Sequence, residues 1–264
     1  MGNMVLMLTA LSGIAWTIVY IAAIRVGFRD RTYAMPLVAL GLNFAWEVIY
    51  TVHGFDTGAS VQTYINLAWT LADAVIVYTF FRFGRRELPG FIGRGVFVGG
   101  GVLVFAACFA VQWLFVVEFD WTLAVRYSAF LQNLLMSGLF IAMLIARRGP
   151  RGQSMVIAVA KWIGTLAPTI VFGVYEGSTF ILGIGILCSV FDLAYIGLLW
   201  MVQRRPQLLV ARATEAEMDR CAAGGSLADD AHRFRSGRAR TADTRHRVLI
   251  EHVDVGATQY GRAP

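Results

Sequence analysis

Three carboxylates lie inside long apolar runs of this sequence, where they are candidates for acid–base chemistry. Glu47 falls within the segment Leu-Asn-Phe-Ala-Trp-Glu-Val-Ile-Tyr (42–50), and Asp73 and Asp192 lie in two later runs. A charged side chain near the centre of a bilayer costs at least about 2.5 to 3.5 kcal/mol, so an acid retained there indicates a functional site. A carboxyl group in a water-poor environment favours its neutral, protonated form, and a protonated carboxyl is a general acid.

Each of these acids has hydrogen-bonding or aromatic neighbours at helical spacing. Residues three, four or seven positions apart share one face of an α-helix. The neighbours are Asn43 and Tyr50 for Glu47, Asn66 and Trp69 for Asp73, and Ser189 and Tyr195 for Asp192. The pattern predicts three helices that each present an acid and its companions to a common interior, where two close acids would share a proton.

The elements that must position these acids are membrane-spanning helices. Hydrophobic residues make up 57% of the 264 residues and charged residues 15%, and the mean hydropathy is +0.61. Such a composition excludes an ordinary soluble domain. About 20 helical residues cross the hydrocarbon core of a bilayer, and seven apolar runs reach about that length. They lie at about 4–26, 34–54, 61–83, 95–117, 122–146, 154–174 and 179–202.

Charged residues alternate between the connecting loops and predict the orientation. The first, third and fifth loops carry arginines, whereas the second, fourth and sixth carry Asp or Glu and no Lys or Arg. Because Lys and Arg concentrate in cytoplasmic loops, we predict an all-α bundle of seven transmembrane helices with the N-terminus outside and the C-terminus in the cytoplasm. The expected location is the cell membrane, which the chain would cross several times.

Hydrophobicity falls sharply after the last run, which divides the chain into a seven-helix domain at 1–203 and a basic, disordered cytoplasmic tail at 204–264. Most of the basic residues behind the net charge of +6 lie in the arginine-bearing loops and in this tail. The charge therefore indicates no nucleic-acid partner, and the expected partner is the lipid bilayer. Cys108, Cys188 and Cys221 have no metal-ligand spacing, so we predict no metal site.

Tryptophans accompany two of the acids. Trp46 adjoins Glu47, and Trp69 lies one helical turn before Asp73. Their rings are candidates for lining a cavity, where cation–π attraction to a transient cation is worth about 2 kcal/mol or more when desolvated. Gln132 also lies inside a span, next to Asn133; we interpret this pair mainly as interhelical hydrogen-bonding residues.

The segment Arg29-Asp30-Arg31-Thr32-Tyr33-Ala34-Met35-Pro36-Leu37, the motif Asn43-Phe44-Ala45-Trp46-Glu47 and the stretch 69–73 resemble a known family over residues 4–203. They are similar to the small integral-membrane terpene cyclases of fungal meroterpenoid and indole-diterpene pathways, which also have bacterial relatives. Asp192 stands where that family carries its second essential acid. The basic tail has no counterpart in the resemblance.

The resemblance implies a metal-independent enzyme without cofactors, of isomerase or lyase type. A protonated acid attacks the terminal alkene or epoxide of a prenyl chain, and a carbocation cascade closes fused rings. The implied substrate is a lipophilic, prenylated aromatic compound with a farnesyl chain. Glu47 and Asp192 map to the acid/base pair, and Asp73 is a third acid. By helical spacing, the candidates for binding substrate are Asn43, Trp46, Tyr50, Trp69 and Tyr195.

Two other classes of protein also place acids among seven helices. A rhodopsin-like protein needs a Schiff-base lysine, normally on the last helix, but Lys161 is the only lysine and lies in the sixth span, where we expect it to snorkel to the membrane surface. A proton-coupled transporter often contains internal repeats and broken helices, and no three-helix repeat is evident. We keep a transporter and a rhodopsin-like or receptor-like protein as the alternatives to a cyclase.

Overall fold

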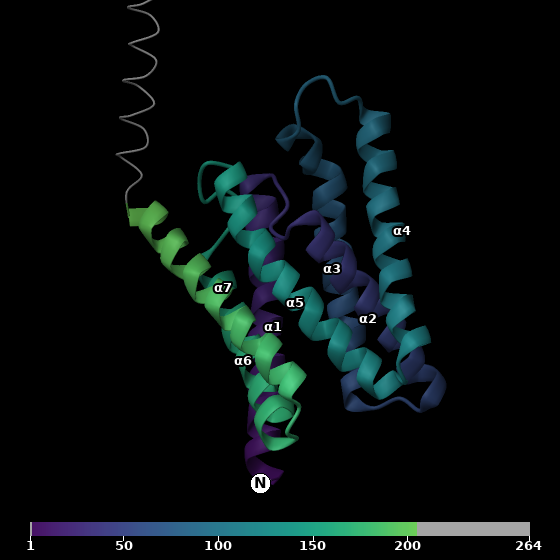
Figure 1. Cartoon of the computed structure of the whole chain (residues 1–264). Helices are drawn as coiled ribbons and strands as arrows, with labels where there is room; N and C mark the ends of the chain where they lie inside the picture. Colours follow the sequence, from purple (N-terminus) through teal and green to yellow (C-terminus); the bar gives the residue numbers. More distant parts are fainter. Residues whose placement is uncertain (1, 205–264) are drawn as a thin grey trace, which may run out of the picture. The chain divides into compact units, whose positions relative to one another are not determined.

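The structure, a computed structural model, describes residues 2–204, and this part of the chain is entirely helical. Seven α-helices and two short segments of other helical types follow one another without a strand (Figure 1). The elements are α1 (Gly2–Asp30), α2 (Leu37–Thr57), α3 (Val61–Phe83), η1 (Gly84–Glu87), α4 (Arg94–Glu118), α5 (Trp121–Ala146), α6 (Met155–Pro168), η2 (Thr169–Tyr175) and α7 (Thr179–Arg204). The all-α prediction is confirmed for these residues. The predicted tail lies outside them.

The helices begin and end close to the predicted spans. With η2 counted as the continuation of α6, differences at the ends of the spans amount to four residues or fewer, and α3 agrees at both ends. Local sequence explains several starts: Asp120 accepts hydrogen bonds from the backbone N–H groups of Thr122 and Leu123 at the start of α5, and Ser60 forms a capping box with Thr63 at the start of α3. Such caps satisfy N–H groups that the first helical turn leaves free.

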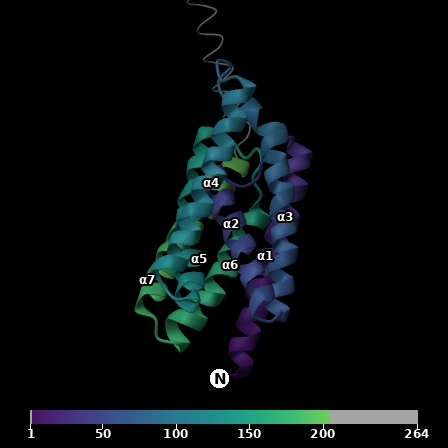
Figure 2. The same ribbon diagram turned by 90° about the vertical axis from the view of Figure 1, so that its right-hand side faces the viewer.

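Six of the helical segments in residues 2–204 are long and apolar enough to cross a membrane. The exception is α2, whose 21 residues include Asn43, Glu47, His53 and Asp56. It packs against α3, α4 and α5 and lies in the middle of the helices around it in Figure 2. The helix α2 thus carries polar residues that are costly to place in a bilayer, and its neighbours surround it. A full count of seven membrane crossings, and their orientation, remain predictions.

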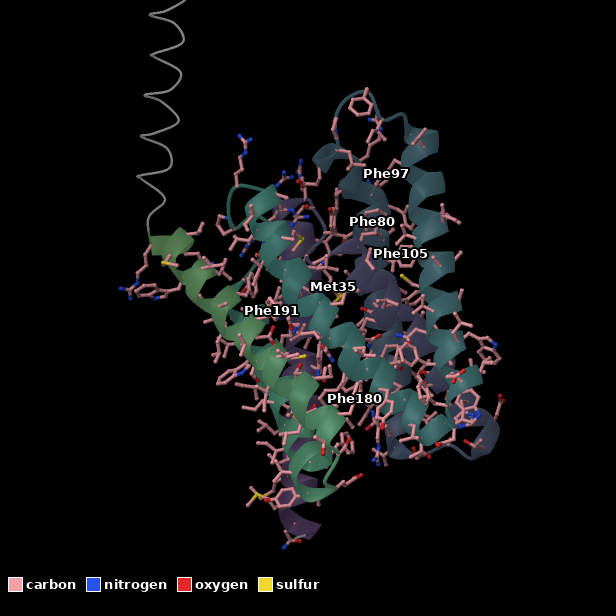
Figure 3. The ribbon with its side chains drawn as sticks, viewed as in Figure 1. Met35, Phe80, Phe97, Phe105, Phe180 and Phe191 are labelled. Carbon is pink, nitrogen blue, oxygen red and sulfur yellow. The ribbon has the colours of Figure 1, made fainter. Side chains whose placement is uncertain are left out.

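Close backbone approach and aromatic packing hold α2, α3 and α4 together. A Cβ atom at Gly41 of α2 would lie 2.7 Å from the Cys108 sulfur of α4, so only glycine permits this approach. Phe80 of α3 and Phe97 and Phe105 of α4 gather between the two helices (Figure 3), with ring centroids 5.1 Å apart for Phe80 and Phe97.

The three arginine-bearing loops meet at one end of the bundle. Arg147 donates hydrogen bonds to the Thr32 hydroxyl and the Tyr33 carbonyl, at 3.1 and 3.0 Å. Arg151 lies 3.2 Å from the carboxylate of Glu87, which also accepts a 2.7 Å hydrogen bond from the Thr32 hydroxyl. These contacts join the connections after α1, α3 and α5, which an up-and-down order of helices brings to the same end.

The segment after Pro168 changes helical type. Residues Thr169–Tyr175 form a π-helix, a rare form that is frequent at functional sites. A Cβ atom at Gly185 of α7 would clash with the side chain of Thr169, so η2 lies tightly against α7. This arrangement fixes the side of η2 that faces the bundle interior.

Candidate active site

A cavity of about 920 Å³ lies inside the bundle, within the range of about 300 to 1,000 Å³ typical of small-molecule sites. Residues of α1, α2, α3, α5, α6 and η2 line it. Glu47 is the only acid among these residues and Arg126 the only cation. Most of the remaining lining is aliphatic or aromatic, so the cavity is an apolar chamber with a few polar groups.

Glu47 is the centre of the polar wall. Its side chain is 97% buried, since only 3% of the residue surface is exposed. Carboxylate Oε1 accepts a 3.1 Å hydrogen bond from the hydroxyl of Tyr20, whereas Oε2 has no hydrogen-bond partner in residues 2–204. No ion pair to Glu47 exists among the described residues. Because an unpaired carboxylate is costly to bury, this environment favours a neutral carboxyl group.

Asn43 links Tyr20, the hydrogen-bond partner of Glu47, to a second acid, Asp73. Its amide nitrogen Nδ2 donates to the Tyr20 oxygen at 2.6 Å and to Asp73 Oδ2 at 2.8 Å. Asp73 is fully buried but does not line the cavity, and its Oδ1 has no partner among the described residues. Asn43 therefore uses both amide hydrogens to hold the two acids in one network.

The network continues from α2 to α5 and α4 through glutamine side chains. Gln132 donates to Asn43 Oδ1 at 3.2 Å, and its own oxygen accepts from Gln112 at 2.6 Å. Gln112 also donates to the Leu42 carbonyl at 3.2 Å. In the order Gln112, Gln132, Asn43, Tyr20, each side chain donates one hydrogen bond to the next, and Tyr20 donates to Glu47. Hydrogen bonds aligned in this way polarise one another and would strengthen when Glu47 becomes negative.

Aromatic rings form the wall beside Glu47. Trp16, Trp46 and Trp69 all line the cavity. Trp46 donates its indole N–H to the Val125 carbonyl at 3.1 Å, and Trp69 donates to the Thr17 hydroxyl at 3.2 Å, so both rings are held in place. Tyr20 contacts both the acid and one of these rings: its hydroxyl donates to Glu47, and its ring centroid lies 5.9 Å from that of Trp69.

Asp192 lies in a separate buried cluster. Lys161 Nζ donates to Asp192 Oδ1 and Oδ2 at 2.8 and 3.1 Å, and to the Ser137 hydroxyl at 2.7 Å. Neither Asp192 nor Lys161 lines the cavity, although Lys161 is one turn from Gly164, which does. The expectation that Lys161 snorkels is wrong: the residue is fully buried, because α7 supplies a carboxylate inside the bundle.

Two further residues expected at the site lie outside the cavity lining. Tyr195 is buried beside Phe140 and donates to Gln153 Oε1 at 2.7 Å. Tyr50 packs against Trp46, with ring centroids 4.9 Å apart, and its hydroxyl has no partner in residues 2–204. The structure thus brings together Asn43, Glu47, Trp46, Trp69 and Asp73, but it does not bring Asp192, Tyr195 or Tyr50 to the cavity.

Within residues 2–204, no three His, Cys, Asp or Glu side chains gather as a metal site.

Comparison with known families connects this geometry to a reaction class. The family model for Pyr4-like transmembrane terpene cyclases matches residues 2–205. The chain belongs to this family. The resemblance seen in the Asn-x-x-Trp-Glu motif is therefore confirmed, and membership favours the cyclase hypothesis over a transporter or a rhodopsin-like protein.

Individual Pyr4-like cyclases align over much of the bundle. The Pyr4-family terpene cyclase mfmH of Annulohypoxylon moriforme is 31% identical over 166 residues, which cover 61% of this chain and 66% of the relative. Terpene cyclase pyr4 of Aspergillus fumigatus is 26% identical over 215 residues, covering 73% and 84%. Terpene cyclase macJ of Penicillium terrestre is 31% identical over 170 residues, covering 62% and 64%. The chain thus spans about two thirds of two of these relatives and more of the third.

Several residues that line the cavity or belong to its hydrogen-bond network are absent from the predicted set. Tyr20 is a tyrosine in the middle of an apolar helix, a position where a hydroxyl needs a partner, and that signal could have found it. Gln132 was interpreted mainly as an interhelical hydrogen-bonding residue; it makes such bonds, but it also lines the cavity. Trp16 and Arg126 line the cavity as well. They lie on other helices than Glu47, so helical spacing in the sequence does not relate them to this acid.

Proposed function

We propose that this chain is a membrane-bound terpene cyclase that protonates the prenyl chain of a lipophilic, farnesylated aromatic substrate and closes fused rings without a metal ion. The observation that carries the proposal is Glu47: a buried carboxyl without a cationic partner, on the wall of an apolar cavity of about 920 Å³. Family membership supports the reaction class. The relatives are named terpene cyclases, which supports an enzyme that cyclises terpenoids.

Glu47 is the proposed general acid. Its Oε1 accepts the Tyr20 hydrogen bond, so the acidic proton belongs on Oε2, the oxygen without a protein partner in the described residues. Transfer of this proton to a terminal alkene carbon, or to an epoxide oxygen with cleavage of its C–O bond, leaves a carbocation on the substrate and a carboxylate on Glu47. Successive double bonds then attack the cation and form C–C bonds. Transfer of a proton from the last cation to the Glu47 carboxylate restores the neutral acid and gives a product of unchanged mass.

Tyr20 and Asn43 stabilise the carboxylate that protonation of the substrate creates. Hydrogen bonds to a charged acceptor are stronger than those to a neutral one. The donor chain through Gln132, Asn43 and Tyr20 is already aligned before the reaction. Such preorganised donors lower the barrier because no reorganisation is needed when charge develops.

The tryptophans have the complementary task of stabilising the cation. The faces of Trp16, Trp46 and Trp69 are electron-rich, and all three residues line the cavity. An apolar wall also excludes water, which would otherwise quench the cation before the rings close.

The cavity is accessible from the lipid-facing side of α1 and α3. Its lining includes Ile14 of α1 and Val61 of α3, which are 61% and 79% exposed, respectively. In a membrane, side chains exposed in this way face lipid. We propose that the prenylated substrate enters from the bilayer between these two helices, and that Trp69 and Thr17, which are hydrogen-bonded across the gap, close behind it.

The other two acids have different proposed tasks. Asp73 accepts a hydrogen bond from Asn43 and so holds the Asn43 amide in the orientation that donates to Tyr20. Asp192 forms an ion pair with Lys161, which also donates to Ser137, and these contacts hold α7, α6 and α5 together. In this proposal Asp192 is a positioning residue, whereas the family resemblance implies an acid/base partner of Glu47.

Replacement of Glu47 by Gln tests the proposal. The amide keeps an oxygen that can accept the Tyr20 hydrogen bond but lacks the acidic proton. Membranes containing the wild type, incubated with farnesylated aromatic compounds and their terminal epoxides, should yield polycyclic isomers of unchanged mass in the presence of a magnesium chelator. Glu47→Gln should lower the rate by about 10² to 10⁴-fold, whereas Glu118→Gln, at an exposed position of α4, should have no effect. Full activity of Glu47→Gln, or a requirement for magnesium, would contradict the mechanism.

A further inference from the structure

Arg126 forms a second polar pole in the cavity. It is the only cationic residue of the lining, and its guanidinium lies 4.4 Å from the ring centroid of Phe172, another lining residue. It also forms an ion pair with Glu176, which follows η2. The proposed cyclisation gives this arginine no task.

Glu47 and Arg126 lie on different walls of the cavity. Trp46 donates its indole N–H to the carbonyl of Val125, so Arg126 begins at about the depth of Trp46 and Glu47. From there the two side chains diverge: Glu47 contacts Tyr20 of α1, whereas the Arg126 guanidinium contacts residues of η2 and the turn after it. A molecule in the cavity therefore meets an acid on one side and a guanidinium on the other.

The ion pair of Arg126 leaves the guanidinium able to bind another group. Glu176 is 44% exposed and Arg126 29% exposed, and ion pairs at that exposure contribute little to stability. A guanidinium has five N–H donors arranged to bind two oxygens side by side. In residues 2–204, Glu176 is the only residue that accepts hydrogen bonds from Arg126. The Phe172 ring would keep the guanidinium in place if the partner oxygen changed.

We propose that Arg126 binds a carboxylate on the aromatic head of the prenylated substrate. This inference rests on the proposed cyclase function and specifies its substrate class. With the head at Arg126, the prenyl chain lies along the apolar wall and its far end reaches Glu47. The negative head group then lies at the partly exposed pair Arg126–Glu176, and the reacting double bonds lie at the buried Glu47.

The test uses two probes that differ only in the acid: a farnesylated hydroxybenzoic acid and its methyl ester. The wild type should have the lower KM for the acid. Arg126→Gln should raise the KM for the acid by about 10-fold or more, as expected for loss of a charge-assisted hydrogen bond, and should leave the KM for the ester and both kcat values nearly unchanged. Arg126→Lys should lie between the two, because it keeps the charge but loses the paired donors.

Glu176→Gln is the matched control. It removes the other half of the ion pair but leaves the guanidinium free for the substrate, so the KM for the acid should stay the same or fall. If Arg126→Gln and Glu176→Gln weaken both probes equally, the pair is structural and the proposal is overturned. Thermal unfolding of each variant shows whether the fold is retained.

A binding assay separates this inference from the cyclase proposal. Trp16, Trp46 and Trp69 line the cavity, so quenching of tryptophan fluorescence reports occupancy without turnover. Glu47→Gln should bind the farnesylated acid with the affinity of the wild type, and the added substitution Arg126→Gln should weaken binding by about 10-fold or more. This result supports the inference even if neither probe is cyclised. Equal affinity with and without Arg126, or no binding of the acid to the wild type, would overturn it.

Discussion

Replacement of Tyr20 by Phe is the sharpest test of the polarised hydrogen-bond chain. The change removes one hydroxyl and with it two hydrogen bonds, the 3.1 Å bond to Glu47 and the 2.6 Å bond from Asn43. The ring remains, so its packing against Trp69 is kept. The carboxyl of Glu47 then has no hydrogen-bond partner among the described residues, and Asn43 loses one of the two acceptors of its amide group.

The expected loss of rate follows from the difference between two states of Glu47. A hydrogen bond to a neutral group contributes about 0.5 to 1.5 kcal/mol and one to a charged group about 1.5 to 3 kcal/mol. Only the difference, about 1 to 1.5 kcal/mol, lowers the barrier, because the bond exists before and after the proton leaves. At 1.36 kcal/mol for each factor of ten, kcat should fall by about 5- to 13-fold.

Stability should change independently of the rate. Each buried polar group that is left unsatisfied costs about 1 to 3 kcal/mol, and Tyr20→Phe leaves two, so the free energy of unfolding should fall by about 2 kcal/mol or more. Tyr50→Phe is the matched control: Tyr50 is also buried, but its hydroxyl has no partner in residues 2–204. It should lose neither stability nor rate.

The assay measures kcat and KM for a farnesylated aromatic substrate together with thermal unfolding in detergent. A folded Tyr20→Phe variant with unchanged kcat would refute the role of the chain in stabilising the carboxylate. A loss as large as that of Glu47→Gln would refute it in another way, because Tyr20 would then be essential to proton delivery itself. If Tyr20 only stabilises the carboxylate, the loss of kcat should be measurable but smaller than that of Glu47→Gln.

Three more predictions follow from the surroundings of the network. Gly13 lines the cavity and a Cβ atom there meets nothing within 4 Å, so Gly13→Trp should obstruct substrate and lower activity by about 10²-fold, whereas Gly100→Trp, at an exposed open position of α4, should not. Asp73→Asn should reduce kcat at least about ten-fold less than Glu47→Gln, because Asp73 does not reach the cavity. Asp192→Asn should destabilise the fold by about 3 to 5 kcal/mol by leaving Lys161 without its counter-ion, and Lys161→Met with Asp192→Leu should restore stability. A stable but inactive double variant would give Asp192 a part in the chemistry.

Helical periodicity placed Asn43 and Glu47 of α2 on one face, but it also placed Tyr50 there, which does not line the cavity. Asn43 and Glu47 are four residues apart, and both line the cavity with Trp46. The helices themselves followed from the apolar runs, because a run of about 20 apolar residues has few other stable forms in a membrane.

Contacts between helices could not be obtained in this way. Periodicity assigns residues to a face but does not say which other helix that face meets. Tyr20 of α1 therefore escaped notice, although it donates the hydrogen bond to Glu47. For the same reason Lys161 was expected at the membrane surface, whereas α7 provides Asp192 as its partner in the interior.

The two buried acid clusters differ in the one property that decides whether a carboxyl group can deliver a proton. Asp192 forms an ion pair with Lys161, with Nζ 2.8 Å from Oδ1, and does not line the cavity, so it does not reach a molecule bound there. Glu47 has only neutral donors around it, and these tolerate a neutral acid while favouring the anion once it forms. An acid must be protonated before the reaction and its conjugate base stabilised afterwards. Of the two acids, only Glu47 also reaches the cavity, and this argues for Glu47 as the residue that starts the cascade.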